Sequence, residues 1–231
     1  MPEPRRPGRL LLATLIGLTV ISGLVDAVSY LGLGHVFTAN MTGNVVLLGF
    51  AAAGASGFSA TACLTSLGAF LLGALAAGRL ARRLSSRRAL LMLAMSTEAV
   101  ATGTAAAIAF GVAAVSSGWP RFTVIAVLAL GMGVRNATIR RLSVPDLTTT
   151  VLTMTLTGLA ADSALAGGTG AQSTRRVAAV LAMLAGACAG AVAFLHVGAG
   201  PTLVIGAAIV LAGGLAFWQA GESRDLDRVT A

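Results

Sequence analysis

The chain has 231 residues, of which 56% are hydrophobic and only 10% are charged, and its mean hydropathy is +0.88. A soluble domain carries about 25% charged residues, so this composition excludes a water-soluble globular protein and predicts an all-α integral membrane protein. The formal charge of +8 comes from arginines in short clusters between long uncharged stretches, a pattern that sets membrane topology. We therefore expect membrane lipid as a partner, and no nucleic acid.

The first predicted element is an apolar helix over residues 10–34. Arg5, Arg6 and Arg9 precede it, as in a signal peptide, but the apolar run is longer than the hydrophobic part of a signal peptide, so we interpret it as a retained transmembrane helix. Asp26 is its one charged residue. An ionisable side chain at membrane depth costs at least ~2.5 kcal/mol and indicates a function by default.

The next stretch, residues 37–57, is apolar but irregular and contains the segment N-M-T-G-N. Asn40, Thr42 and Asn44 supply amide and hydroxyl groups, and Gly43 permits a turn or a close backbone approach. Irregular chain at membrane depth persists only where protein buries it or where it lines an aqueous cavity. We expect a short helix to begin near Thr42.

Further along the chain, apolar segments alternate with arginine clusters. A helix needs about 20 residues to cross ~30 Å of hydrocarbon. The six segments that meet this length are residues 10–34, 59–78, 89–115, 122–139, 177–196 and 202–218. Glu98 lies inside the third of them, either as a protonatable group or as a neutral one bonded to Ser96 or Thr97, while Arg135 and Asn136 lie near the end of the fourth.

A second irregular stretch follows at residues 147–167, after Pro145. It is rich in threonine, and Thr149 and Thr153 occupy positions comparable to those of the first irregular stretch. A short helix beginning near Thr149 would point its positive end into the membrane, as would the one near Thr42. Such ends suit an anionic or carbonyl-bearing solute.

The arginines decide between six and eight crossings. If the two irregular stretches enter and leave on the same side and the N-terminus is cytoplasmic, fifteen of the sixteen arginines lie on the cytoplasmic side and only Arg121 lies outside. If both stretches cross, eight arginines lie on each side. Cytoplasmic loops carry an excess of basic residues, so we predict six transmembrane helices plus two re-entrant segments, with both termini cytoplasmic. Eight crossings remain the alternative.

Residues 1–231 form a single transmembrane domain with two related halves, 10–115 and 120–219. Gly23-Leu-Val-Asp26 recurs as Gly133-Val-Arg-Asn136, and the Thr38–Thr42 segment aligns with residues 149–153. Because three crossings per half is an odd number, the halves would have opposite orientations and form an inverted 3+3 repeat, as in many transporters. Eight crossings would give a parallel 4+4 repeat instead.

These features predict a solute pathway between the halves. Its predicted residues are Asp26, Asn40, Thr42, Gly43, Asn44, Arg135, Asn136, Thr149 and Thr153, with Glu98 as a further titratable group. Asp26 and Arg135 hold corresponding places in the two halves, so we predict an ion pair between them, either functional or fixing helix register. The polar groups of the irregular stretches either line the pathway or satisfy one another in a packed interface.

The segments G-L-V-D-A-V-S-Y-L, F-T-A-N-M-T-G-N and V-R-N-A-T-I-R-R, with the downstream T-T-T-V-L-T, resemble the YoaK-like family of bacterial multi-pass membrane proteins, a domain of unknown function. The resemblance covers nearly the whole chain, and N-M-T-G-N is its most specific part. It implies an inner-membrane protein and supplies no substrate.

We therefore expect a small-solute transporter or channel of the bacterial inner membrane, and the alternative is a non-transporting scaffold or accessory subunit. The sequence carries none of the common catalytic or nucleotide-binding signatures, so we expect no enzyme, no cofactor and no metal site. Small residues at four-residue spacing, such as Gly186 and Gly190, fit either packing within the chain or a homo-oligomer.

Overall fold

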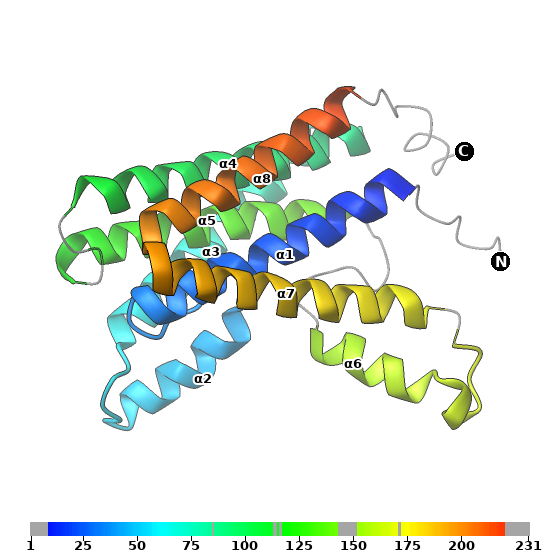
Figure 1. Cartoon of the computed structure of the whole chain (residues 1–231), viewed down its shortest axis with the longest axis horizontal. Helices are drawn as coiled ribbons and strands as arrows, with labels where there is room; N and C mark the ends of the chain where they lie inside the picture. Colours follow the sequence, from blue (N-terminus) through cyan, green and yellow to red (C-terminus); the bar gives the residue numbers. More distant parts are fainter. Residues whose placement is uncertain are drawn as a thin grey trace.

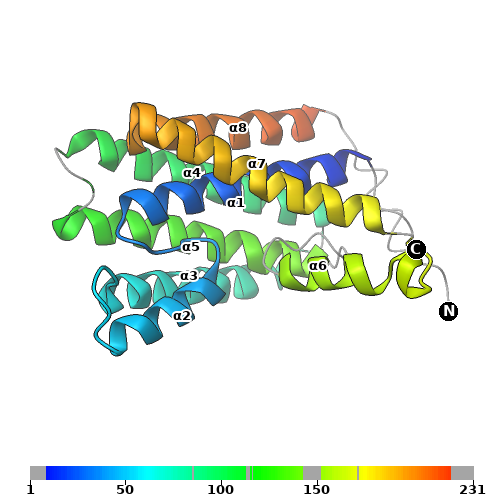
Figure 2. The same cartoon turned by 60° about the horizontal axis from the view of Figure 1, so that its bottom comes forward.

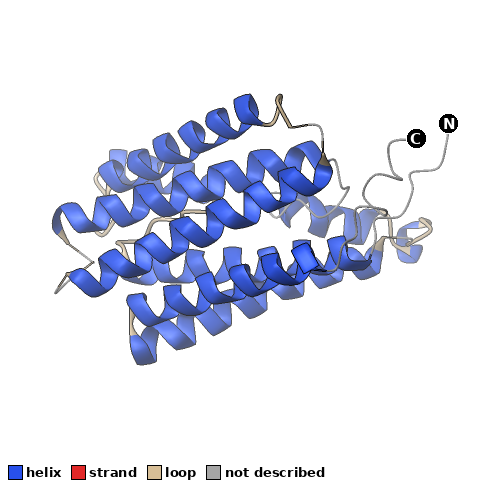
Figure 3. Ribbon diagram, turned by 90° about the horizontal axis from the view of Figure 1, so that it is seen from above, coloured by secondary structure: helices blue, strands red, loops and turns tan. Residues whose placement is uncertain are grey.

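The computed structural model describes residues 9–84, 86–112, 115, 117–142, 152–170 and 172–219. Over these ranges the chain forms eight α-helices, a short 3₁₀ helix (Ala164–Ala166) and no strand (Figures 1 and 3). The α-helices are α1 (Arg9–Gly32), α2 (Met41–Ala52), α3 (Ala60–Leu80), α4 (Arg87–Gly111), α5 (Gly118–Leu142), α6 (Leu152–Ala161), α7 (Ser173–Val197) and α8 (Ala199–Gln219). The predicted all-α class is confirmed.

The helices fall into two length classes. Six of the described helices have 21 to 25 residues, contain a strongly apolar window and are long enough to cross a bilayer. The other two, α2 and α6, have 12 and 10 residues and so extend only about 18 and 15 Å at 1.5 Å per residue. Neither α2 nor α6 reaches across ~30 Å of hydrocarbon, so we refer to them as half-helices.

The direction of each helix fixes the topology. The six long helices run from one end of the bundle to the other, with α1 beginning and α8 ending at the same end, called here the termini end (Figure 1). Half-helix α2 starts in the middle of the bundle and returns to the end at which α1 finished, whereas α6 starts in the middle and runs to the termini end (Figures 1 and 2). The structure thus has six long spans and two re-entrant half-helices.

Close helix packing depends on glycines that lack a Cβ atom. A Cβ on Gly23 of α1 would collide with the backbone of α7 at Met183. A Cβ on Gly186 of α7 would collide with the backbone oxygen of Val20 in α1. In α5, a Cβ on Gly133 would collide with the backbone oxygen of Phe70 in α3. The pairs α1–α7 and α3–α5 therefore approach with their backbones in contact, as membrane helices with small residues do.

Leucines on the outer surface fit a lipid environment. Leu71, Leu72 and Leu75 of α3 are more than half exposed, as are Leu181 and Leu184 of α7. By contrast, α1 and α5 lie at the centre of the bundle, where most of their residues are buried. The centre of the molecule is therefore built from the first helix of each predicted half.

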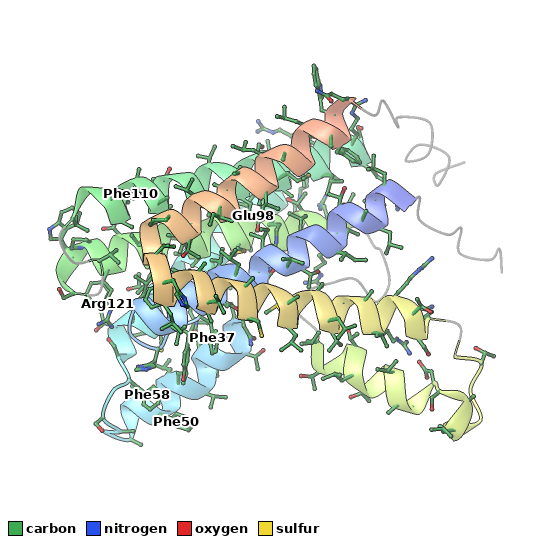
Figure 4. The ribbon with its side chains drawn as sticks, in the orientation of Figure 1. Phe37, Phe50, Phe58, Glu98, Phe110 and Arg121 are labelled. Carbon is green, nitrogen blue, oxygen red and sulfur yellow. The ribbon has the colours of Figure 1, made fainter. Side chains whose placement is uncertain are left out.

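The arginines are distributed unevenly between the two ends. The α3–α4 connection, the end of α5 and the start of α7 all lie at the termini end and carry arginines, whereas Arg121 lies at the opposite end (Figures 1 and 4). One prediction is wrong: Arg135 was counted with a cytoplasmic loop, yet it is 0% exposed. Helix α5 continues through Arg140 and Arg141 to Leu142, so Arg135 lies two turns inside the helix.

Candidate functional site

The turn before α2 is fixed by a single buried asparagine. Asn44 Oδ1 accepts a hydrogen bond from the backbone N–H of Phe37 (2.9 Å), and Asn44 Nδ2 donates to the Phe37 carbonyl (2.6 Å) and to Ser66 Oγ of α3 (3.1 Å). Ser66 Oγ in turn donates to the same carbonyl (2.7 Å). Asn44 thus holds the re-entrant segment against α3 and does not line the predicted pathway, so its predicted role has to be corrected.

Aromatic packing completes this re-entrant segment. The Phe37 ring stacks on Tyr30 of α1 at 4.9 Å between centroids. It leaves no room for a Cβ on Gly43, which would lie 2.6 Å from a Phe37 ring carbon. Figure 4 shows Phe37, Phe50 and Phe58 gathered beside α2. Gly43 was predicted to permit a turn or a close backbone approach, and the close neighbour in the structure is instead the Phe37 ring.

Asp26 of α1 accepts hydrogen bonds at the start of α2. Its Oδ1 accepts from the backbone N–H groups of Thr38 (3.0 Å) and Ala39 (2.8 Å), just ahead of the helix that begins at Met41. A carboxylate in this position also interacts favourably with the positive end of the α2 dipole. The Asp26 side chain is 4% exposed, and its Oδ2 atom is buried without a hydrogen-bond partner in the described part of the chain.

A cavity of about 280 Å³ lies between the starts of the two half-helices, and we call it the central cavity. Small-molecule sites in proteins span ≈ 300–1,000 Å³, so this one suits a solute of few atoms. Its polar lining residues are Ser22, Asp26, Asn40, Thr42 and Thr153. Its other lining residues are Ala39, Gly43, Val46, Leu152, Leu156 and Met183. The walls thus come from α1, α2 with the turn before it, α6 and α7.

Five of the predicted pathway residues line this cavity, namely Asp26, Asn40, Thr42, Gly43 and Thr153. Thr149 lies outside the described residues. Asn44, Arg135 and Asn136 are not among the lining residues. The half-helix starts were predicted near Thr42 and Thr149, and the structure has α2 beginning at Met41 and α6 at Leu152.

The buried Arg135 pairs with Glu98 of α4 instead of Asp26. Arg135 Nη1 lies 2.8 Å from Glu98 Oε1, and the two side chains are 0% and 1% exposed. Figure 4 shows Glu98 within the bundle. The predicted Asp26–Arg135 ion pair is therefore wrong, although Arg135 is near enough to attract Asp26 electrostatically. The bond expected between Glu98 and Ser96 is also not made, because Ser96 Oγ donates to the Leu93 carbonyl.

Arg135 makes further bonds that link the ion pair to α1. Its Nη1 donates to the Leu18 carbonyl (3.0 Å), and its Nη2 donates to Ser22 Oγ (2.6 Å) and, at 3.5 Å, to Asn136 Oδ1. Ser22 also lines the central cavity, so this residue contacts both the buried guanidinium and the cavity. The sequence analysis missed Ser22, although it precedes Asp26 by four residues and so lies on the same face of the helix.

A second ion pair holds the far end of α6. Arg176 of α7 lies 2.7 Å from Asp162 Oδ2 and also donates to the Gly158 carbonyl (2.5 Å). A cation near the last carbonyls of a helix interacts favourably with its dipole. Asp162 is 61% exposed, so this pair is solvated, unlike Arg135–Glu98. It attaches α6 to α7 at the termini end.

Comparison with known proteins agrees with this architecture. Residues 14–216 match the family described as "Protein of unknown function (DUF1275)". The chain is 34% identical over 152 residues to "UPF0700 transmembrane protein YoaK" of Bacillus subtilis (strain 168). That alignment covers 64% of this chain and 66% of the relative, just under two thirds of its length. No solved structure matches the chain significantly. The match over residues 14–216 shows that the chain belongs to the DUF1275 family.

Proposed function

We propose that this protein is a transporter or channel for a small solute in the bacterial plasma membrane, with its pathway through the central cavity. The observation that carries the proposal is that two half-helices start from opposite ends of the bundle beside one cavity, whose lining includes five polar residues. Discontinuous helices that meet near the midplane form the substrate sites of many transporters. A protein with a purely structural role has no need for polar residues around an interior cavity, because buried polar groups are costly in the membrane.

An inverted repeat supports the same proposal. Helices α1 to α4 correspond in order to α5 to α8, and each half has three long helices and one half-helix. Gly23 of α1 meets the backbone of α7, and its counterpart Gly133 of α5 meets the backbone of α3, which is the counterpart of α7. This exchange of equivalent contacts is what a pseudo-twofold axis in the membrane plane produces.

The arginine distribution supports a cytoplasmic location for both termini. Arg79, Arg87, Arg140 and Arg175 lie in the terminal turns of long helices at the termini end, while Arg121 lies in the first turn of α5 at the opposite end. Short loops with basic residues remain cytoplasmic during membrane insertion. In this orientation α2 enters from outside and α6 from the cytoplasm, and the relative YoaK is itself described as a transmembrane protein.

Solute entry into proteoliposomes tests the proposal. The purified chain is reconstituted, and osmotic swelling is followed by light scattering with urea, glycine, propylammonium and propionate as probes. We expect protein-dependent entry of at least one probe. Thr153→Val should change its rate by about two- to ten-fold, because one hydroxyl hydrogen bond to solute contributes ~0.5–1.5 kcal/mol.

Thr157→Val is the matched control. Thr157 lies one turn further along α6, is not among the cavity-lining residues, and donates to the Thr153 carbonyl of its own helix (2.9 Å). The same chemical change there should leave the rate unaltered. If no probe enters faster than in protein-free liposomes, or if both variants change the rate equally, the pathway proposal fails and a scaffold or accessory role is favoured.

A further inference from the structure

Among the described residues, Asp26 is the one charged residue that lines the central cavity. Its Oδ1 accepts two backbone hydrogen bonds, whereas its buried Oδ2 has no partner in the described part of the chain. A buried carboxylate that is short of donors is costly, so a cationic group that enters this cavity and donates to the Asp26 carboxylate gains free energy. Thr42 and Thr153 offer hydroxyl oxygens on other walls of the same cavity.

The charges around the cavity favour a positively charged solute. None of the described residues that line the cavity is basic. The nearby guanidinium of Arg135 is paired with Glu98 and donates to the Leu18 carbonyl and Ser22 Oγ on the far side of the wall. Because Asp26 already provides a carboxylate at the start of α2, the expectation that this helix end would attract an anionic solute no longer holds there.

Building on the proposed pathway, we propose that the central cavity binds a small primary ammonium, with the cationic N–H groups donating to the Asp26 carboxylate. The alkyl part of the solute contacts Val46, Leu156 and Met183. The cavity of about 280 Å³ restricts the solute to a few non-hydrogen atoms.

Calorimetric titration of the full chain in lipid nanodiscs tests this inference without any need for transport. The probes are propylammonium chloride, 1-propanol and sodium propionate, which have similar shapes and charges of +1, 0 and −1. Propylammonium should bind saturably and the other two should not. Asp26→Asn should weaken propylammonium binding by about 10- to 100-fold, because a hydrogen bond to a charged group contributes ~1.5–3 kcal/mol.

The controls separate loss of charge from loss of fold. Asp26→Asn keeps an Oδ1 that can accept from Thr38 and Ala39, and Asp26→Glu keeps the charge and should retain binding. Asp162→Asn removes a 61% exposed carboxylate away from the cavity and should bind as the wild type does. Leu156→Trp fills the cavity without touching Asp26 and should abolish binding even if Asp26→Asn does not fold.

Binding of propionate as tight as that of propylammonium, no propylammonium binding to wild type, or unchanged binding to Asp26→Asn would overturn the inference. These outcomes differ from failure of the proposed function. Entry of neutral probes into liposomes without propylammonium binding would refute only the ammonium site. Saturable propylammonium binding without entry of any probe would support the ammonium site and refute only the pathway.

Discussion

Removing one member of the buried Arg135–Glu98 pair should destabilise the protein severely. At 2.8 Å and 0–1% exposure, the Coulomb attraction is about 6 kcal/mol at an effective dielectric constant of about 20, before desolvation is subtracted. Breaking a buried pair by removing one partner costs about 3–5 kcal/mol. We therefore expect Glu98→Leu to lower the free energy of unfolding by this amount.

The two single variants should not be equal. Arginine stays protonated in proteins, so Glu98→Leu leaves a full positive charge among α1, α4 and α5. A glutamate can take up a proton instead, so Arg135→Met should cost less than Glu98→Leu. The double variant replaces both charges by apolar side chains, which is often close to neutral, and it should be more stable than Glu98→Leu alone.

Reversible unfolding in mixed detergent micelles, followed by circular dichroism, measures these differences. Asp162→Asn is the control, because the Asp162 side chain is 61% exposed and its pair with Arg176 should contribute no more than about 1 kcal/mol. A cost for Glu98→Leu as small as that of the control would refute the assignment of a dry, buried ion pair. A double variant as unstable as the sum of the two single variants would refute the compensation argument.

Two further substitutions test the packing that positions the cavity, by the same unfolding assay. Gly23→Ala should lower the free energy of unfolding by about 1–3 kcal/mol, because its Cβ would collide with the backbone of α7. The control is Gly17→Ala in the same helix, where a Cβ would meet no atom within 4 Å. It should change the free energy of unfolding by less than about 0.5 kcal/mol. Asn44→Leu should cost about 1–3 kcal/mol by leaving the Phe37 N–H without its acceptor, and hydrogen exchange of α2 should accelerate. Thr65→Val, in which an exposed hydroxyl loses a bond to its own helix, should change neither. If a variant and its control lost equal stability, the contacts assigned to Gly23 or Asn44 would be contradicted.

The sequence predicts the helices well because their signals are local. Apolar length located all six spans, and several boundary errors come from arginines. The predicted span 122–139 stops before Arg140 and Arg141, but α5 continues to Leu142, since arginine side chains at a helix end can extend toward water. The start of half-helix α2 was predicted to within one residue, because the polar segment N-M-T-G-N interrupts the apolar run.

The predicted ion pair between Asp26 and Arg135 is wrong because the prediction rested only on their corresponding positions in the two halves. Asp26 and Arg135 hold corresponding positions, but the partner of each is set by which helices pack together. Arg135 faces Glu98 because α4 packs beside α5, and Asp26 faces the turn before α2. No local sequence pattern indicates that Asn44 holds the backbone of Phe37 or that Ser22 contacts both Arg135 and the cavity. Both roles arise from contacts between segments far apart in the sequence.

The most direct test of the account is the sidedness of the two connections that follow the half-helices. In a chain with Cys63→Ala and Cys188→Ala, single cysteines are introduced as Ala55→Cys, between α2 and α3, and as Thr169→Cys, between α6 and α7. An impermeant maleimide added to intact cells should label the first, and the second should react only after permeabilisation. Labelling of both from the same side would show that α2 and α6 belong to full crossings and would contradict a cavity formed by half-helices from opposite leaflets.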